Sequence, residues 1–460
     1  MRRIIFAGVG VLLTNRRLLR AKLFGEGILI GAATGVVIAA LRFFLDTADI
    51  WRPIIFAHVD SIGRILLICA VMILFAITLT CAVKIDPQVC GSGVPQIKGM
   101  LQGRAEMFKP LRLLTIKFFS TVMAIGAGMS LGRAGISVQF GAIIGNFFTK
   151  KFYGKHPRHE SFQGNFLLTA GAGAGLAAIF NAPLTGVIFC IEELRKKFSQ
   201  ELLTVAVTAA VTASFVVKVI FGVRPVFETI TRTPFNVPSV MTMLTEEMSE
   251  IFSAEPLKFL ALFVLLGVIC GIAGVLFVRA LIFSLDTYDC LKIFGTRRFL
   301  IPFLLIVPLG IELPQVLGCG NVLVDEILVS QLSLTLLVTL LVGKILFTLI
   351  CFGTNAPGGL FLPVLVVGAL IGNIFARVGN LMDIFTADWT TVFIIFGMAA
   401  FFAAVVKAPV TGAVLILELT GQFAHLLWLI IVAGTAFLVA DLCGSEPIFS
   451  ALLERSQSKK

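Results

Sequence analysis

Long apolar stretches alternate with short polar or basic segments along most of the chain. About 20 predominantly apolar residues are enough for a helix to cross a bilayer. The clearest stretches predict membrane-spanning helices at residues 26–45, 63–83, 201–221, 257–283, 333–353 and 424–442. The pattern therefore predicts an all-α polytopic membrane protein.

The composition supports this class and excludes others. Hydrophobic residues make up 58% of the chain, charged residues 14%, and the mean hydropathy is +1.01, whereas soluble domains carry roughly 25% charged residues. The net charge of +11 does not indicate nucleic-acid binding, because Lys and Arg form short clusters beside the spans, as the positive-inside rule requires. Nine cysteines without regular spacing indicate packing residues rather than disulfides or a metal site. We expect neither a metal nor a cofactor.

The polar segments suggest four parts of the chain. Residues 1–24 are basic and apolar and lack a cleavage site, which favours a cytoplasmic amphipathic segment over a signal peptide. We expect residues 25–223 to form a first membrane repeat and residues 257–460 a second one with a short cytoplasmic tail. Residues 224–256 are acidic and contain proline, which predicts an extracellular linker.

Two glycine-framed loops open directly into apolar helices. The first covers residues 132–139 and leads into 141–146, and the second covers 358–363 and leads into 368–373. The first N–H groups of a helix have no partner within it, and the helix dipole adds partial positive charge there. Such starts bind anions through the backbone alone. In a chain this apolar, they predict an anion held within the membrane.

These loops belong to a long internal repeat. Gly141 and Gly368 lie 227 positions apart, and Pro183 and Pro409, in matching Ala-Pro-x-Thr-Gly motifs, lie 226 apart. A register kept over so many residues indicates a duplication. Lysines follow the first copy at positions 150–151 but not the second, so equivalent helices end on opposite sides of the membrane. We therefore expect an inverted-topology repeat whose broken helices meet at the bilayer midplane, with the substrate there.

Three motifs carry a resemblance to a known family. Gly91-Ser92-Gly93-Val94-Pro95, Gly132-Arg133-Ala134-Gly135-Ile136 and Gly359-Leu360-Phe361-Leu362-Pro363 resemble the G-S-G-I-P, G-R-E-G-P and G-x-F-x-P motifs of the CLC family of chloride channels and chloride/proton antiporters. The similarity covers about residues 25–453 and fits the prokaryotic type without a C-terminal soluble domain.

The resemblance implies a chloride transport protein with the CLC fold. It implies a homodimer of two pores, surrounded by lipid in the bacterial inner (plasma) membrane, with both termini in the cytoplasm. The transported partners are chloride and, in the antiporters, protons.

The resemblance also implies an anion-binding set, made of Ser92, Gly93, Leu360, Phe361 and Phe449. Ser92 would place its hydroxyl on the anion, although a serine before a helix start is otherwise an N-cap, and both roles are compatible. Leu360 and Phe361 would donate backbone N–H groups. Phe449 stands where the family has an inner-gate tyrosine, so the ring is kept and the hydroxyl donor is lost.

The gate position departs from the family pattern. Ala134, between Arg133 and Gly135, stands where the family has a glutamate that competes with chloride and carries a proton. A methyl group does neither, since it is not an acceptor. Glu193 resembles the family's internal proton-transfer glutamate; the alternative is an interfacial carboxylate paired with Arg195 or a neighbouring lysine. We therefore predict passive chloride conduction without proton coupling.

Four basic residues lie within or beside apolar helices: Lys117, Arg133, Lys344 and Lys407. They either raise the electrostatic potential along the pore or extend their charged ends to the membrane surface by snorkelling.

Other functions remain open on the sequence alone. Another residue could replace the gate and keep proton-coupled antiport. A cation-coupled solute carrier also fits an inverted repeat, but it needs membrane-embedded acidic residues, and few are present beyond residues 192–193. An intramembrane enzyme or a primary pump is disfavoured, because the chain contains neither H-E-x-x-H nor a Walker loop.

Overall fold

The computed structural model describes residues 2–57, 61–104, 109–153, 163–222, 254–291, 296–386, 389–421 and 425–458. Within these ranges the regular structure is helical, apart from one isolated β-bridge between Gly132 and Gly359. Residues 223–253, which make up most of the predicted linker, lie outside the described residues, and the linker stays a prediction.

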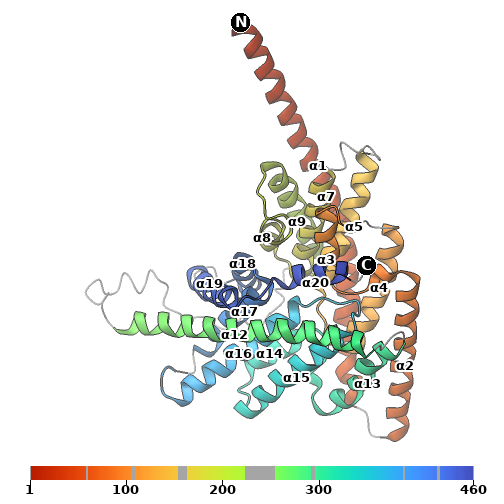
Figure 1. The fold of residues 1–460 in the computed structure, drawn as a ribbon, viewed down its shortest axis with the longest axis vertical. Coiled ribbons are helices and arrows are strands. Elements are labelled where there is room, and N and C mark those ends of the chain that lie inside the picture. Colours follow the sequence, from red (N-terminus) through yellow and green to blue (C-terminus); the bar gives the residue numbers. More distant parts are fainter. Residues whose placement is uncertain are drawn as a thin grey trace. The chain divides into compact units, whose positions relative to one another are not determined.

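The predicted spans are confirmed as helices. Seven described helices are long and apolar enough to cross a membrane: Arg20–Ala57, Ile62–Ile85, Pro110–Ala127, Gln200–Phe221, Lys258–Cys290, Leu334–Gly353 and Phe361–Leu381. The predicted span at 424–442 is the shorter apolar helix α19, Leu426–Leu442. The first span is part of α1, Arg2–Ala57, which is continuous through residue 24 (Figure 1).

Residues 1–40 and 137–223 form one compact unit. It contains the first part of α1 and the body of α5 (Ala134–Tyr153), followed by α7 (Gln163–Phe180), α8 (Pro183–Phe189), the π-helix η2 (Cys190–Arg195) and α9 (Gln200–Phe221).

Glycines let the helices of this unit approach closely. A β-carbon added at Gly141 of α5 would lie 1.9 Å from the carbonyl oxygen of Gly171 in α7, and one added at Gly31 of α1 would lie 2.4 Å from Ala209 O in α9. These backbones therefore touch in a way that only small residues allow.

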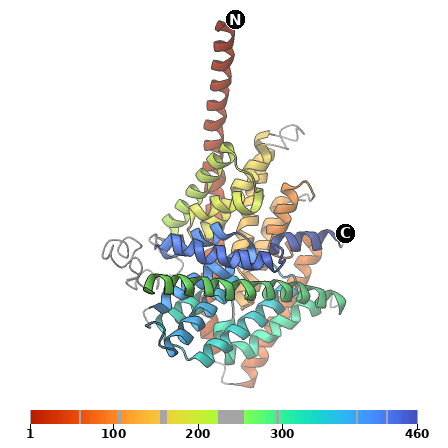
Figure 2. The same cartoon turned by 60° about the vertical axis from the view of Figure 1, so that its left-hand side comes forward.

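Residues 41–136 and 224–460 form the second compact unit. Its long helix α12 (Ala254–Cys290) packs against α15 (Leu334–Gly353), α17 (Thr390–Val406) and α19. Figures 1 and 2 both show α12 with α19 on one side and α15 on the other. The unit further contains α2 (Ile62–Ile85), η1 (Pro87–Val89), α3 (Val94–Leu101), α4 (Pro110–Ala127), α13 (Thr296–Glu312), η3 (Pro314–Val316), α14 (Asn321–Val329), α16 (Phe361–Leu381), α18 (Pro409–Thr420) and α20 (Ile448–Ser458).

The packing within each unit repeats as the sequence repeats. In the second unit, a β-carbon added at Gly397 of α17 would lie 2.4 Å from Gly368 O in α16. This is the same close approach that Gly171 and Gly141 make in the first unit, where the corresponding distance is 2.1 Å. Gly368 is the repeat counterpart of Gly141, and Gly397 lies 226 positions after Gly171. The repeat predicted from the sequence is therefore present in the helix contacts.

Local signals explain where several helices begin and end. Ser199 and Ser333 cap α9 and α15 by accepting hydrogen bonds from the backbone N–H groups of Leu202 (3.1 Å) and Leu336 (3.3 Å). Proline occupies the first turn of α3, α4, α8 and α18, where its missing N–H costs nothing. Gly421 ends α18 in the left-handed conformation. The broken helices of the repeat thus follow from ordinary start and stop chemistry.

Candidate functional site

The two glycine loops meet in the second unit. The N–H of Gly132 donates to Gly359 O at 2.7 Å, and the N–H of Gly359 donates to Gly132 O at 2.6 Å. The pairing is reciprocal and antiparallel. Two equivalent segments of an inverted repeat are expected to pair in this way. The pairing places the start of α5 against the start of α16, as the repeat predicts.

The loop that carries Ser92 joins this pair. A β-carbon added at Gly135 would lie 3.0 Å from Ser92 O, 3.1 Å from Ser92 Cβ and 3.4 Å from Gly359 Cα. Glycine at position 135 therefore lets three chain segments approach one another. The next residue after Ser92, Gly93, is the N-cap of α3 at φ 87°, a left-handed conformation that favours glycine.

The hydroxyl of Ser92 is buried and has no hydrogen-bond partner among the described residues; the residue is 2% exposed. The N-cap role considered for Ser92 is wrong, because the cap is Gly93 and no side chain caps α3. Buried polar groups are almost always paired. This hydroxyl is thus available to a bound species.

The other residues predicted to bind the anion lie in neighbouring segments of the second unit. Leu360 is the N-cap of α16 and Phe361 its first residue, and both are 1% exposed. The fully buried ring of Phe449, in the first turn of α20, stacks on that of Phe361 with centroids 5.6 Å apart. Lys98 Nζ of α3 donates to Ser450 Oγ of α20 at 2.8 Å. The starts of α3, α5, α16 and α20 therefore lie close together, and the N–H groups of helix starts favour an anion.

The Phe449→Tyr variant is expected to bind chloride more tightly than the unmodified protein. A hydroxyl restored at this position adds one hydrogen-bond donor to the anion, which contributes ~1.5–3 kcal/mol at most. Calorimetric titration of chloride measures the difference. Phe375→Tyr is the matched control, because Phe375 lies in the same helix as Phe361 but 14 positions farther on. Its ring contacts that of Phe393 instead. Equal affinities for Phe449→Tyr and the unmodified chain would place Phe449 away from the anion.

The predicted gate position holds a buried methyl group at the start of a helix. Ala134 is the first residue of α5 and is fully buried. The preceding Arg133 is 2% exposed, and its Nη1 donates to Asp46 Oδ1 of α1 at 2.6 Å. The Asp46 carboxylate is therefore engaged by Arg133, and the side chain at position 134 has no proton to exchange.

Two of the four basic residues are fully buried, which excludes snorkelling for them. These two are Lys117 in α4 and Lys344 in α15. Lys344 Nζ donates to the carbonyl oxygens of Val316 (2.9 Å) and Gly318 (2.8 Å), whereas Lys117 Nζ has no hydrogen-bond partner within the described part of the chain. Lys407 Nζ, in contrast, pairs with the exposed Asp441 at 2.9 Å.

The two buried lysines are counterparts in the repeat, which the sequence interpretation missed. Lys117 and Lys344 lie 227 positions apart, as do the Pro-Gln-Val turns η1 and η3, and Ser92 and Cys319. Cys319 is 1% exposed, and its thiol donates to Leu131 O at 3.2 Å. The identical Pro-Gln-Val triplets at residues 87–89 and 314–316 were the sequence signal that could have revealed this pairing.

Glu193 belongs to the other compact unit, which contains residues 137–223. It is 1% exposed and lies in the π-helix η2, a rare element that often marks functional positions. The guanidinium group of Arg195 lies over the ring of Phe166, 5.1 Å from its centroid. The proton-transfer role of Glu193 stays a prediction.

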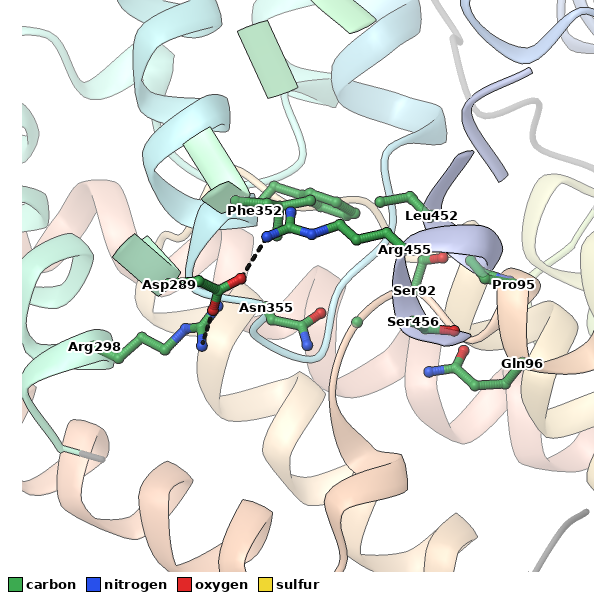
Figure 3. A pocket seen from close by; sticks show the side chains of 12 residues that line it. Ser92, Pro95, Gln96, Asp289, Arg298, Phe352, Asn355, Leu452, Arg455 and Ser456 are labelled. Atoms are coloured by element: carbon green, nitrogen blue, oxygen red, sulfur yellow. Dashed lines mark hydrogen bonds and ion pairs between the residues drawn. The ribbon is translucent and has the colours of Figure 1, made fainter. Parts of the chain in front are cut away.

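A cavity of about 270 Å³ lies directly beside Ser92 (Figure 3). Besides Ser92, its polar lining includes Asp289 of α12, Arg298 of α13 and Arg455 of α20. Asn355, which lies between α15 and α16, also lines it. The backbone carbonyl of Asn355 accepts a hydrogen bond from Gly91 N at 3.0 Å, which ties the cavity wall to the Ser92 loop. Sequence reasoning missed these residues, because no motif connects positions so far apart.

The chain is similar to known chloride transport proteins over most of its length. The family profile described as "Voltage gated chloride channel" matches residues 72–441. The chain is 34% identical over 449 residues to the H(+)/Cl(-) exchange transporter ClcA of Vibrio vulnificus, covering 94% of this chain and 88% of that relative. It is 36% identical over 381 residues to ClcA of Vibrio cholerae, covering 81% of this chain and 76% of that relative.

Solved structures share the fold. The crystal structure of a slow cyanobacterial Cl-/H+ antiporter matches with a TM-score of 0.83 at 28% identity, covering 95% of this chain and 98% of that one. A eukaryotic CLC transporter shares the fold at 22% identity, with a TM-score of 0.74 and coverage of 95% and 74%. The resemblance seen in the three motifs is thus confirmed over most of the chain: this is a multi-pass membrane protein of the voltage gated chloride channel family, the CLC family.

Proposed function

We propose that this protein conducts chloride passively across the membrane, through the group formed by Ser92, Leu360, Phe361 and Phe449. The observation that carries the proposal is the buried Ser92 hydroxyl without a hydrogen-bond partner among the described residues. It lies beside the starts of α3, α5 and α16, whose N–H groups favour an anion. Chloride is the anion named in the relatives' descriptions.

Lack of proton coupling follows from Ala134. A carboxylate at this position competes with an anion for N–H donors when ionised and releases them when protonated. The buried methyl group of Ala134 leaves the donors open to anions in every state. Glu193 would then be able to take up protons but would have no gate to pass them to.

Proton-coupled antiport is the second candidate. Its support is the 34% identity to a relative described as an H(+)/Cl(-) exchange transporter and the 28% identity to a Cl-/H+ antiporter. In this case another titratable group would replace the gate. The homodimer implied by the resemblance is part of either proposal.

Reconstitution into liposomes distinguishes the two. Purified protein is placed in chloride-loaded vesicles, and chloride efflux and internal pH are recorded together under an outward chloride gradient. Passive conduction predicts chloride and bromide flux that needs a potassium ionophore for charge balance, with no uphill proton movement. Uphill proton transport would establish antiport instead, and potassium flux comparable to chloride flux would overturn anion selectivity itself.

A further inference from the structure

An ion-pair cluster lines the cavity beside Ser92 and has no role in the function proposed above. Asp289 Oδ1 accepts from Arg298 Nη1 at 3.4 Å, and Asp289 Oδ2 accepts from Arg455 Nη2. Figure 3 shows the Asp289 carboxylate between the two guanidinium groups, one from α13 and one from α20. We call these three residues the Asp289 cluster.

Both arginines are largely withdrawn from water. The side chain of Arg298 is 17% exposed and that of Arg455 is 14% exposed, against 27% for Asp289. Arg298 Nη2 also donates to Gly353 O at 3.0 Å. Arg455 Nη1, however, is buried and has no hydrogen-bond partner among the described residues. The cavity wall therefore contains a guanidinium nitrogen whose N–H groups form no hydrogen bond with the described residues.

A second aspartate contacts Arg455 but differs in its surroundings. Asp286 Oδ1 lies 2.8 Å from Arg455 Nη2, on the same helix as Asp289 and one turn earlier. Its side chain is 57% exposed, and it is not among the residues that line the cavity. Its charge is therefore screened by water much more than that of Asp289.

The balance of charge decides how strongly such a cavity holds an anion. Two guanidinium groups that are largely withdrawn from water attract an anion more strongly than fully exposed ones would. A carboxylate that binds both offsets this attraction and repels the anion directly. An anion that passes through must bind firmly enough to enter the cavity and weakly enough to leave it.

We infer that Asp289 is a positioning residue that holds Arg298 and Arg455 and so weakens anion binding in the cavity beside Ser92. This inference rests on the proposed chloride conduction. Asp289 then keeps the anion mobile, while the arginines attract it. Because Arg455 and Phe449 lie on the same short helix α20, the pairing also fixes the element that carries the ring next to the anion.

The test is a calorimetric titration of chloride into the full chain in detergent, with gluconate as the background anion. Asp289→Asn is expected to bind chloride about three- to tenfold more tightly, and the gain should shrink as ionic strength rises. Asp289→Glu keeps the charge and should restore the original affinity. Asp286→Asn is the matched control and should change the affinity by less than about twofold, because its charge is exposed.

A second variant covers the case in which Asp289→Asn does not fold. Arg455→Gln leaves Asp289 paired with Arg298 and should weaken chloride binding about three- to tenfold. Unchanged affinity in a folded Asp289→Asn, or in Arg455→Gln, would overturn the inference while leaving chloride conduction intact. Absence of both chloride binding and chloride flux in the unmodified chain would instead overturn the proposed function, and the inference with it.

Discussion

Ala134→Glu is expected to slow chloride flux at pH 7 by about tenfold or more, and to make that flux rise as the pH falls. The new carboxylate sits at the buried start of α5, where N–H donors and the helix dipole stabilise its ionised form. In that form it occupies the place of the anion. Burial opposes the ionised form, so protonation between about pH 7 and 4 removes the charge and reopens the path. Flux is therefore lost above the carboxylate pKa and regained below it.

The unmodified chain should show little pH dependence over the same interval, because position 134 does not titrate. Ala134→Gln is the matched control: it has nearly the size of glutamate but no charge, so it should slow flux without producing acid activation. Flux in liposomes at a series of pH values gives the profile. Proton movement is then compared between the Ala134→Glu variant and the double variant that also carries Phe449→Tyr. An acid-activated unmodified chain would show that another residue serves as the gate.

Lys344→Met is expected to destabilise the protein by about 2–5 kcal/mol, because removing the ammonium group leaves buried carbonyls unpaired. Lys344 Nζ bonds the carbonyls of Val316 and Gly318, and Gly318 N in turn donates to Gly128 O at 2.8 Å. Losing the lysine therefore loosens the segment that supports the chain just before the glycine-framed loop at residues 132–139. The midpoint of thermal unfolding in detergent should fall, and chloride flux should fall with it.

Lys258→Met provides the comparison, since Lys258 is exposed at the beginning of the span in α12. Its substitution should leave the unfolding midpoint nearly unchanged, as is usual for exposed positions. If Lys344→Met unfolded at the same temperature as this control, the two hydrogen bonds of Lys344 would contribute no net stability.

The sequence predicted those parts of the site that depend on local chemistry. The spans, the glycine-framed helix starts and the motif around Ser92 are readable because each is determined within a few neighbouring residues. The contact of Asp289 with Arg455 joins positions 166 residues apart, and no periodicity or motif links them. The burial of Lys344 was also unpredictable from one apolar stretch, because its partners lie in a turn that precedes α14.

The buried lysines have a consequence for the two directions of transport. An inverted duplication begins as a molecule that looks the same from either face of the membrane, and such a molecule passes ions equally well both ways. Here the counterparts have diverged: Lys344 and Cys319 are bonded to backbone carbonyls, whereas Lys117 Nζ and the Ser92 hydroxyl have no hydrogen-bond partner among the described residues. At these two pairs of positions the halves of the duplication therefore no longer offer equivalent polar groups. The current through this protein should therefore rectify, with unequal conductance at opposite voltages of equal size.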